Sequence, residues 1–253
     1  MISVSSVNFT TENVEDCFAK VAKEFRHWEI MSDGEHHLPL VSKRILALAP
    51  SYDVKFSIHT PISDVNIASL CERMREAATM EVISAMEQAI ELNANVVTFH
   101  PGYYSLAVPG HEQRSAEKSK RSMRTIDRLM NEFGITACAE NMPAFEFMMG
   151  RTAKEMFDLV DGTDLKICFD IGHANTTDQI GEMIDLLGDR IKNIHIHDNN
   201  GKNDDHMTIG DGSIDFKRVL KRLSGYKGVY VIESRSLDSA VTSRDRLEKL
   251  LRS

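Results

Sequence analysis

Short apolar segments rich in strand-forming residues alternate with longer segments of helical spacing along the whole chain. This alternation constrains the fold more than any other feature. The short segments are Ile2–Phe9, Trp28–Met31, Val54–His59, Val96–His100, Ile135–Glu140, Lys166–Asp170, Asn193–His197 and Val229–Glu233. Helical spacing is clearest in Ala68–Leu92, Ser115–Glu132 and Thr176–Leu187, and two further helices are expected at Ser213–Leu223 and Ser239–Leu251.

Strict alternation of strand and helix predicts a parallel sheet, and eight repeats predict that the sheet closes into a barrel. The length of 253 residues suits one such barrel. An open doubly wound sheet is disfavoured because no GxGxxG follows the first strand. No linker, low-complexity segment or charge block divides the chain. We therefore predict an α/β fold, a (β/α)₈ TIM barrel, as a single domain over residues 1–253.

Composition narrows the classes of partner. The net charge of −8 argues against a wide phosphate-binding surface, because Lys and Arg supply most non-specific affinity for nucleic acids. No apolar run approaches the roughly 18 residues that cross a bilayer, so no membrane association is expected. The first residues lack a basic segment followed by an apolar one, which predicts a cytoplasmic protein without a signal peptide.

Histidines and acidic residues occur where the predicted strands end, and composition does not require this. Six of the ten histidines of the chain occupy such positions or the loops just beyond them. The residues are His59, His100, Glu140, Asp170, His173, His195, His197, Asp198, Asp204, His206 and Glu233. A parallel barrel brings the carboxyl ends of all its strands to one face, where active sites lie.

Imidazoles and carboxylates that converge on one face need a cation to neutralise them. Mixed nitrogen and oxygen donors suit Zn²⁺ best, with Mn²⁺ as the other choice. We therefore predict a divalent-metal site.

Several single residues keep two interpretations. Asp170 could cap a helix, Glu29 could support the site or form a core ion pair, and Tyr103, Tyr104 and Arg235 could contact a substrate or only pack. The remaining histidines are expected on the surface or in loops; they are His27, His36, His37 and His111.

The ordered stretches HTPISDVNIAS, FHPG, AEN, FDIGHAN, HIHD, DDH, IGDGSIDF and VIES resemble the xylose-isomerase-like barrel superfamily. That superfamily holds sugar isomerases and epimerases together with endonuclease-four-type AP endonucleases (AP endonuclease family 2). The resemblance runs from the third predicted strand to the eighth. Each stretch alone is a weak signal, whereas their order along the chain is specific.

The sugar branch implies one metal ion held by Glu140, Asp170, His195 and Glu233. In such a site the metal stabilises an enediolate oxygen, the two glutamates exchange a proton with carbon, and His173 orients a substrate oxygen. The implied partner is a small-molecule sugar or sugar phosphate. This isomerase or epimerase interpretation is the one we favour.

The nuclease branch implies three zinc ions and phosphodiester hydrolysis, with DNA as partner under this alternative alone. Its nine ligands match His59, His100, Glu140, Asp170, His173, His195, Asp204, His206 and Glu233. Against it, Ile62 and Ser63 stand where the nucleases place a wedge that opens DNA.

Strand seven offers two histidines on the same face, because Ile196 between them points to the other. The H-x-x-D pattern of the superfamily begins at His195. We therefore expect His195 to bind metal directly and His197 to lie behind it or face the substrate.

Overall fold

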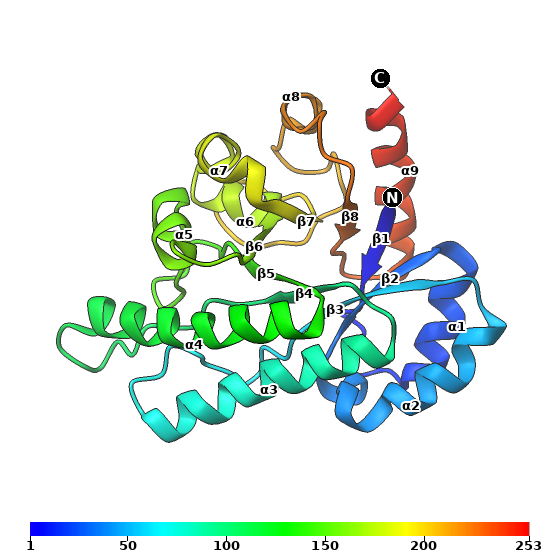
Figure 1. The fold of residues 1–253 in the computed structure, drawn as a ribbon. Coiled ribbons are helices and arrows are strands. Elements are labelled where there is room, and N and C mark those ends of the chain that lie inside the picture. The colour runs from blue at the N-terminus through cyan, green and yellow to red at the C-terminus, as the bar shows by residue number, and fades with distance from the viewer. Residues whose placement is uncertain (253) are drawn as a thin grey trace.

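A computed structural model describes residues 1–252 and shows one closed barrel in which β1 to β8 pair in sequence order, all in parallel (Figure 1). The strands are β1 (Ile2–Ser5), β2 (His27–Met31), β3 (Lys55–His59), β4 (Val96–Phe99), β5 (Thr136–Glu140), β6 (Lys166–Asp170), β7 (Ile191–Ile196) and β8 (Val229–Ile232). Pairing of β1 with β8 closes the barrel. The predicted (β/α)₈ TIM barrel is confirmed.

Helices surround the strands (Figure 1). The α-helices are α1 (Val14–Glu24), α2 (Leu38–Leu48), α3 (Glu72–Glu91), α4 (His111–Phe133), α5 (Ala153–Val160), α6 (Ile171–Thr176), α7 (Ile180–Leu187), α8 (Phe216–Arg222) and α9 (Leu237–Arg252). The described residues also contain three short 3₁₀ helices, η1 (Gly34–His36), η2 (Ala49–Ser51) and η3 (Gly188–Arg190). Within residues 1–252, no helix combines the length and the hydropathy needed to cross a membrane.

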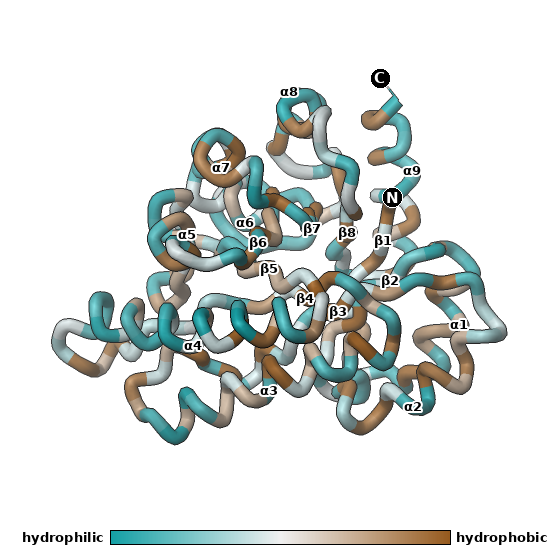
Figure 2. Tube along the Cα trace, in the orientation of Figure 1, coloured by the Kyte–Doolittle hydropathy of each residue, from teal (hydrophilic) through white to brown (hydrophobic). Residues whose placement is uncertain are grey.

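Alternate side chains along each strand face either the surrounding helices or the interior of the barrel. Trp28 of β2 packs against Phe18 of α1, with ring centroids 5.5 Å apart, so it faces the helical layer. Its neighbour Glu29 points the other way and contacts Ser57 of β3 and Asn193 of β7 inside the barrel. The helices match this arrangement: α4 is mostly hydrophilic in Figure 2, with hydrophobic residues recurring along it.

Local signals set where the helices begin. Asn13 caps α1 by accepting the backbone N–H groups of Glu15 and Asp16, and Thr152 caps α5. Asp215 caps α8, so this helix begins at Phe216 and not at Ser213 as expected from the sequence.

Other expected bounds were also wrong. The first strand ends at Ser5, because the N–H of Phe9 bonds to the carbonyl of Ser6 and turns the chain. The helix expected at Thr176–Leu187 begins only at Ile180 as α7. Thr176 is instead the last residue of α6, and Asp178 lies between the two helices with a left-handed φ of 54°.

Two histidines expected on the surface or in loops are buried. His27 lies in β2, where its Nδ1 is 2.9 Å from the Ser3 hydroxyl, and His36 is completely buried against the edge of Trp28. The contacts of the two rings, with Ser3 and Trp28, come from other elements of the fold, and spacing alone does not reveal them.

Candidate metal centre

The carboxyl ends of the strands bring the nine predicted donors together at one end of the barrel. In the sheet, His195 of β7 lies beside Asp170 of β6, and Glu140 of β5 lies beside Cys168, two residues before Asp170. Glu140, Asp170, His195 and Glu233 are at most 4% exposed. The donors form three groups that share Glu140 or lie next to it.

The first group is His59, His100 and Glu140. The Nε2 atoms of His59 and His100 lie 3.0 and 3.2 Å from Glu140 Oε2. His59 Nδ1 is 2.8 Å from the carbonyl of Thr60, and because a carbonyl only accepts, this nitrogen carries the proton. The Nε2 of a neutral His59 therefore presents a lone pair to a carboxylate, an arrangement that a cation would satisfy.

The second group surrounds His195. Its Nδ1 lies 3.0 Å from Glu140 Oε1, 3.3 Å from Glu233 Oε1 and 3.9 Å from Asp170 Oδ2. Three carboxylates from β5, β6 and the end of β8 thus meet at one imidazole nitrogen. These are the four residues that the sugar branch of the resemblance implies as ligands.

Asp170 has two structural tasks besides facing this group. Its Oδ1 accepts the N–H of His173 at 2.7 Å and caps α6, as one of its two interpretations expected. The Asn141 side chain bonds to both the N–H and the carbonyl of Asp170, at 2.8 and 2.9 Å. Asp170 Oδ2 is buried without a hydrogen-bond partner among residues 1–252 and faces His195.

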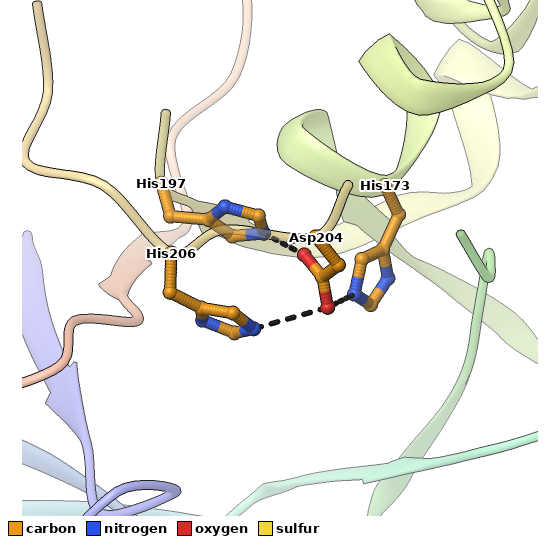
Figure 3. A group of neighbouring side chains, drawn as sticks. All are labelled: His173, His197, Asp204 and His206. Atoms are coloured by element: carbon orange, nitrogen blue, oxygen red, sulfur yellow. Dashed lines mark hydrogen bonds and ion pairs between the residues drawn. The ribbon is translucent and has the colours of Figure 1, made fainter. Parts of the chain in front are cut away.

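The third group is His173, His197, Asp204 and His206 (Figure 3). Asp204 Oδ2 lies 3.3 Å from His173 Nε2 and 3.1 Å from His206 Nε2, and Asp204 Oδ1 lies 3.3 Å from His197 Nε2. One ligand atom from each residue falls within 4.8 Å of all the others. His173 Nδ1 donates to the carbonyl of Asn141 at 2.8 Å, which leaves Nε2 facing the carboxylate.

His197 is the member of this group that the nine-residue match does not contain. Its ring stacks on His206 with centroids 4.2 Å apart, and its Nε2 also lies 3.3 Å from Asp170 Oδ1. Gly172 makes room for this ring, because a Cβ at that position would come within 2.0 Å of His197 Cε1. His197 therefore joins the second and third groups.

The loop after β7 is built around Asp198. The Asp198 carboxylate accepts the N–H groups of Gly210 and Gly212, each at 2.9 Å, and its backbone pairs with that of Met207. His206, beside Met207, has a left-handed φ of 46°, which is rare outside glycine. Asp198 therefore shapes the loop that turns His206 toward Asp204.

Glu29, whose role the sequence left open, lies behind His195. Its Oε1 is 2.7 Å from His195 Nε2, while Oε2 accepts from the Ser57 hydroxyl at 2.8 Å and the Asn193 amide at 2.9 Å. A proton on Nε2 is held toward Glu29, so Nδ1 is the nitrogen that faces the three carboxylates. Asn193 had no sequence signal, because an asparagine inside a barrel strand has no distinctive spacing.

The buried charges stabilise one another. Burial alone would raise the pKa of Glu140, but the charge of His195 and hydrogen bonds from His100, His195 and His59 hold it well below the usual value. Burial alone would lower the pKa of His195, yet its acidic neighbours raise it well above the usual value. His100 has a lowered pKa because burial outweighs its contact with Glu140. A metal ion bound among these groups would replace the protons that they share.

The donor set fits a divalent metal. In each group one imidazole has a nitrogen committed outward, to a carbonyl or carboxylate, and the other aimed at carboxylates; these are His59, His173 and His195. Such outward contacts are typical of metal-bound histidines. Among residues 1–252, Asp170 Oδ2, Asp204 Oδ1 and His206 Nδ1 are buried without hydrogen-bond partners, and a cation would satisfy them.

Two other candidate residues are engaged elsewhere. The Tyr104 hydroxyl donates to Glu155, and Arg235 donates to the backbone carbonyl of Asp205 at 2.7 Å. These contacts support the packing interpretation for both residues. Tyr103 is half-buried, and its hydroxyl donates to the carbonyl of Ile62 at 3.4 Å.

Comparisons with known proteins agree with the fold. The chain is 36% identical over 258 residues to the uncharacterized protein MJ1311 of Methanocaldococcus jannaschii, covering 98% of this chain and 88% of that one. A crystal structure of a D-tagatose 3-epimerase-like protein superposes with a TM-score of 0.93 at 35% identity, covering 99% of this chain and 97% of the other. A probable endonuclease 4 of Thermoplasma volcanium is 26% identical over 166 residues, 59% of this chain and 56% of that one.

The family described as xylose isomerase-like TIM barrel matches residues 18–252. That match covers β2 to β8 and every donor named above, so the chain belongs to the xylose isomerase-like TIM barrel family.

Proposed function

We propose that this protein is a divalent-metal-dependent isomerase or epimerase of a sugar or sugar phosphate. The observation that carries the proposal is the pair of buried glutamates on His195 Nδ1, Glu140 at 3.0 Å and Glu233 at 3.3 Å. They come from β5 and the end of β8, with β6 and β7 between them. Inverting a carbon next to a carbonyl calls for one group that takes the proton from one face and a second that returns a proton to the other face.

The residues that would hold the metal are Glu140, Asp170, His195 and Glu233. Zn²⁺ or Mn²⁺ bound there would supply the positive charge that polarises a substrate carbonyl and its neighbouring hydroxyl. The similarity to a D-tagatose 3-epimerase-like protein at 35% identity supports the sugar class.

The carboxylates of Glu140 and Glu233 differ in how many imidazole nitrogens contact them. Glu140 uses both oxygens on imidazoles, with Oε2 near His59 and His100 and Oε1 near His195. Glu233 Oε2 has His206 Nδ1 as its imidazole neighbour at 3.6 Å. Glu233 is therefore the freer base to take a proton from substrate carbon, and Glu140 is the group that returns one. His173, at the rim, would orient a substrate oxygen through Nε2.

A second function, phosphodiester hydrolysis, is favoured by one observation: all nine donors of a three-metal site are present and grouped. Its expected partner is DNA with an abasic site. The position of the wedge does not support it, because the N–H groups of Ile62 and Ser63 both bond to Asp33 Oδ2 at 3.0 Å. The loop is thereby held down, and neither residue is aromatic.

Metal content and proton exchange separate the two functions. For the isomerase we expect one tightly held ion per chain and incorporation of deuterium from D₂O next to the carbonyl of a ketose, followed by NMR. The Asp204→Ala/His206→Ala double variant should keep this ion and lose sugar turnover. Three tightly held ions, with nicking of abasic duplex that the double variant lacks, would establish the hydrolase instead.

A further inference from the structure

Three aromatic side chains stand together on the loops that follow β4 and β5. Phe145 and Phe147 stack with ring centroids 5.7 Å apart and 14° between their planes, and Tyr103 lies 5.8 Å from Phe147. The two phenylalanines are 43% and 42% exposed. Exposed neighbouring aromatics are unfavourable in water and mark surfaces that bind something. We call Tyr103, Phe145 and Phe147 the aromatic platform.

The aromatic platform adjoins the metal centre. Tyr103 follows His100 by three residues, and Phe145 follows Glu140 by five, so both loops leave directly from donor positions. The Tyr103 hydroxyl donates to the carbonyl of Ile62 at 3.4 Å, on the loop that follows the donor His59.

The far side of the platform loop is fixed to the same site. The N–H of Ala144 bonds to the hydroxyl of Thr176 at 3.0 Å. Thr176 is the last residue of α6, and its hydroxyl donates to the carbonyl of His173 at 2.8 Å. The loop that carries the two phenylalanines therefore spans from the helix of His173 to the loop of Tyr103.

The platform is also held rigidly. The Asn66 side chain bonds to both the N–H and the carbonyl of Tyr103, and the N–H of Tyr104 bonds to the carbonyl of Phe147 at 2.7 Å. Gly150 closes the loop with a φ of 86°, where a Cβ would approach Met156 Sδ to 2.6 Å. The rings are thus presented to solvent on a braced loop, and this preorganisation favours binding.

The two surfaces differ in chemistry and depth. Glu140 and Glu233 are 1% and 4% exposed and suit the polar hydroxyls of a sugar, whereas the platform is apolar and open. Glu146, exposed between the two rings in sequence, disfavours an anionic group at this position. A neutral planar ring matches the stacked faces.

We propose that the substrate is a sugar joined to a neutral aromatic or heteroaromatic group, and that this group stacks on Phe145 and Phe147 while the sugar reaches Glu140 and Glu233. This inference rests on the proposed function for the position of the sugar. It assigns the platform to substrate selection and not to proton transfer.

Binding of the 6-O-phenyl and 6-O-methyl ethers of D-fructose, which keep the ketose carbonyl, tests the platform by calorimetry on the purified protein. The phenyl ether should bind about tenfold more tightly, as expected when one ring stacks on an aromatic surface. Phe145→Ala/Phe147→Ala should abolish the difference, and Phe147→Leu, which keeps bulk without an aromatic face, should reduce it. The control is Phe157→Ala, because Phe157 is 37% exposed on α5 outside the platform.

Equal affinity of wild type for the two ethers, or failure of both to bind, would overturn the inference. So would a preference that survives in a folded double variant. The assay needs no turnover, so the two proposals fail separately. A phenyl preference without deuterium exchange into any ketose would sustain the platform and reject the isomerase.

Discussion

The contact between Glu29 and His195 gives the sharpest test of how the metal centre is held. In a Glu29→Gln variant the side chain keeps its shape and loses its charge. If the amide oxygen faces His195 Nε2, the amide NH₂ faces the Asn193 NH₂, which in the wild-type structure lies 2.9 Å from the Glu29 carboxylate. If the amide is flipped, its NH₂ faces the Nε2–H of His195, whose Nε2 in the wild-type structure lies 2.7 Å from Glu29 Oε1. Either orientation sets one donor against another.

The Asn193 amide can flip to relieve the first conflict, but in either orientation the Nε2–H loses its charged acceptor. His195 is then freer to turn or to move its proton to Nδ1, the nitrogen that faces the three carboxylates. Loss of such an outward partner typically weakens metal binding by about 10–100-fold. That range corresponds to about 1.4–2.7 kcal/mol of binding free energy. We expect this loss for Zn²⁺ at the group of Glu140, Asp170, His195 and Glu233.

Competition for Zn²⁺ between the metal-free protein and a chromophoric chelator would measure it. Ser57→Ala is the matched control, because it removes a neutral hydroxyl donor from the same carboxylate, 2.8 Å from Oε2, and leaves the charge in place. Its affinity should change by less than about threefold, in keeping with the smaller worth of a neutral hydrogen bond. A folded Glu29→Gln protein with wild-type zinc affinity would refute the reasoning and leave Glu29 as a core ion pair.

Three further outcomes are expected. His195→Ala should lose tightly bound metal, whereas His197→Ala should retain it at the group around Glu140; metal analysis that finds equal retention would contradict the assignment of His195. Gly172→Ala should lower the free energy of unfolding by about 1–3 kcal/mol, measured by denaturant titration, since its Cβ would meet the His197 ring at 2.0 Å. Burial lowers the pKa of His27 from 6.5 to about 4. The unfolded chain is therefore protonated first as the pH falls below 6.5, and the His27 contribution to stability is lost between pH 6.5 and 4. Urea unfolding at pH 4.5 should show about 2–3 kcal/mol less stability from this group than at pH 7, and a His27→Gln variant should lack that part of the pH dependence.

The order of strands and helices, and the donor residues at the strand ends, were readable from the sequence because both depend on local pattern. Alternation of apolar and helical segments fixes a parallel barrel, and a parallel barrel places His59, Glu140 and Asp170 at one face wherever the helices begin. Errors in bounds, such as the helix expected from Thr176 that begins at Ile180, did not disturb this result.

Tertiary structure decided what each donor contacts. Sequence alternation sends Glu29 to the inside of β2, but only closure of the barrel brings it across to Asn193 and His195 on β7. The stacking of His197 on His206 likewise depends on the loop that Asp198 organises after β7.

The aromatic platform shows the same division. Phe145 and Phe147 have no period that predicts exposure, and their loop is positioned by bonds to Tyr104 and Thr176, which lie far away in the sequence. Residue type and spacing determine which chemistry a strand end can offer. Which groups meet, and which nitrogen of an imidazole faces a metal, depends on contacts between segments that come together only when the sheet closes.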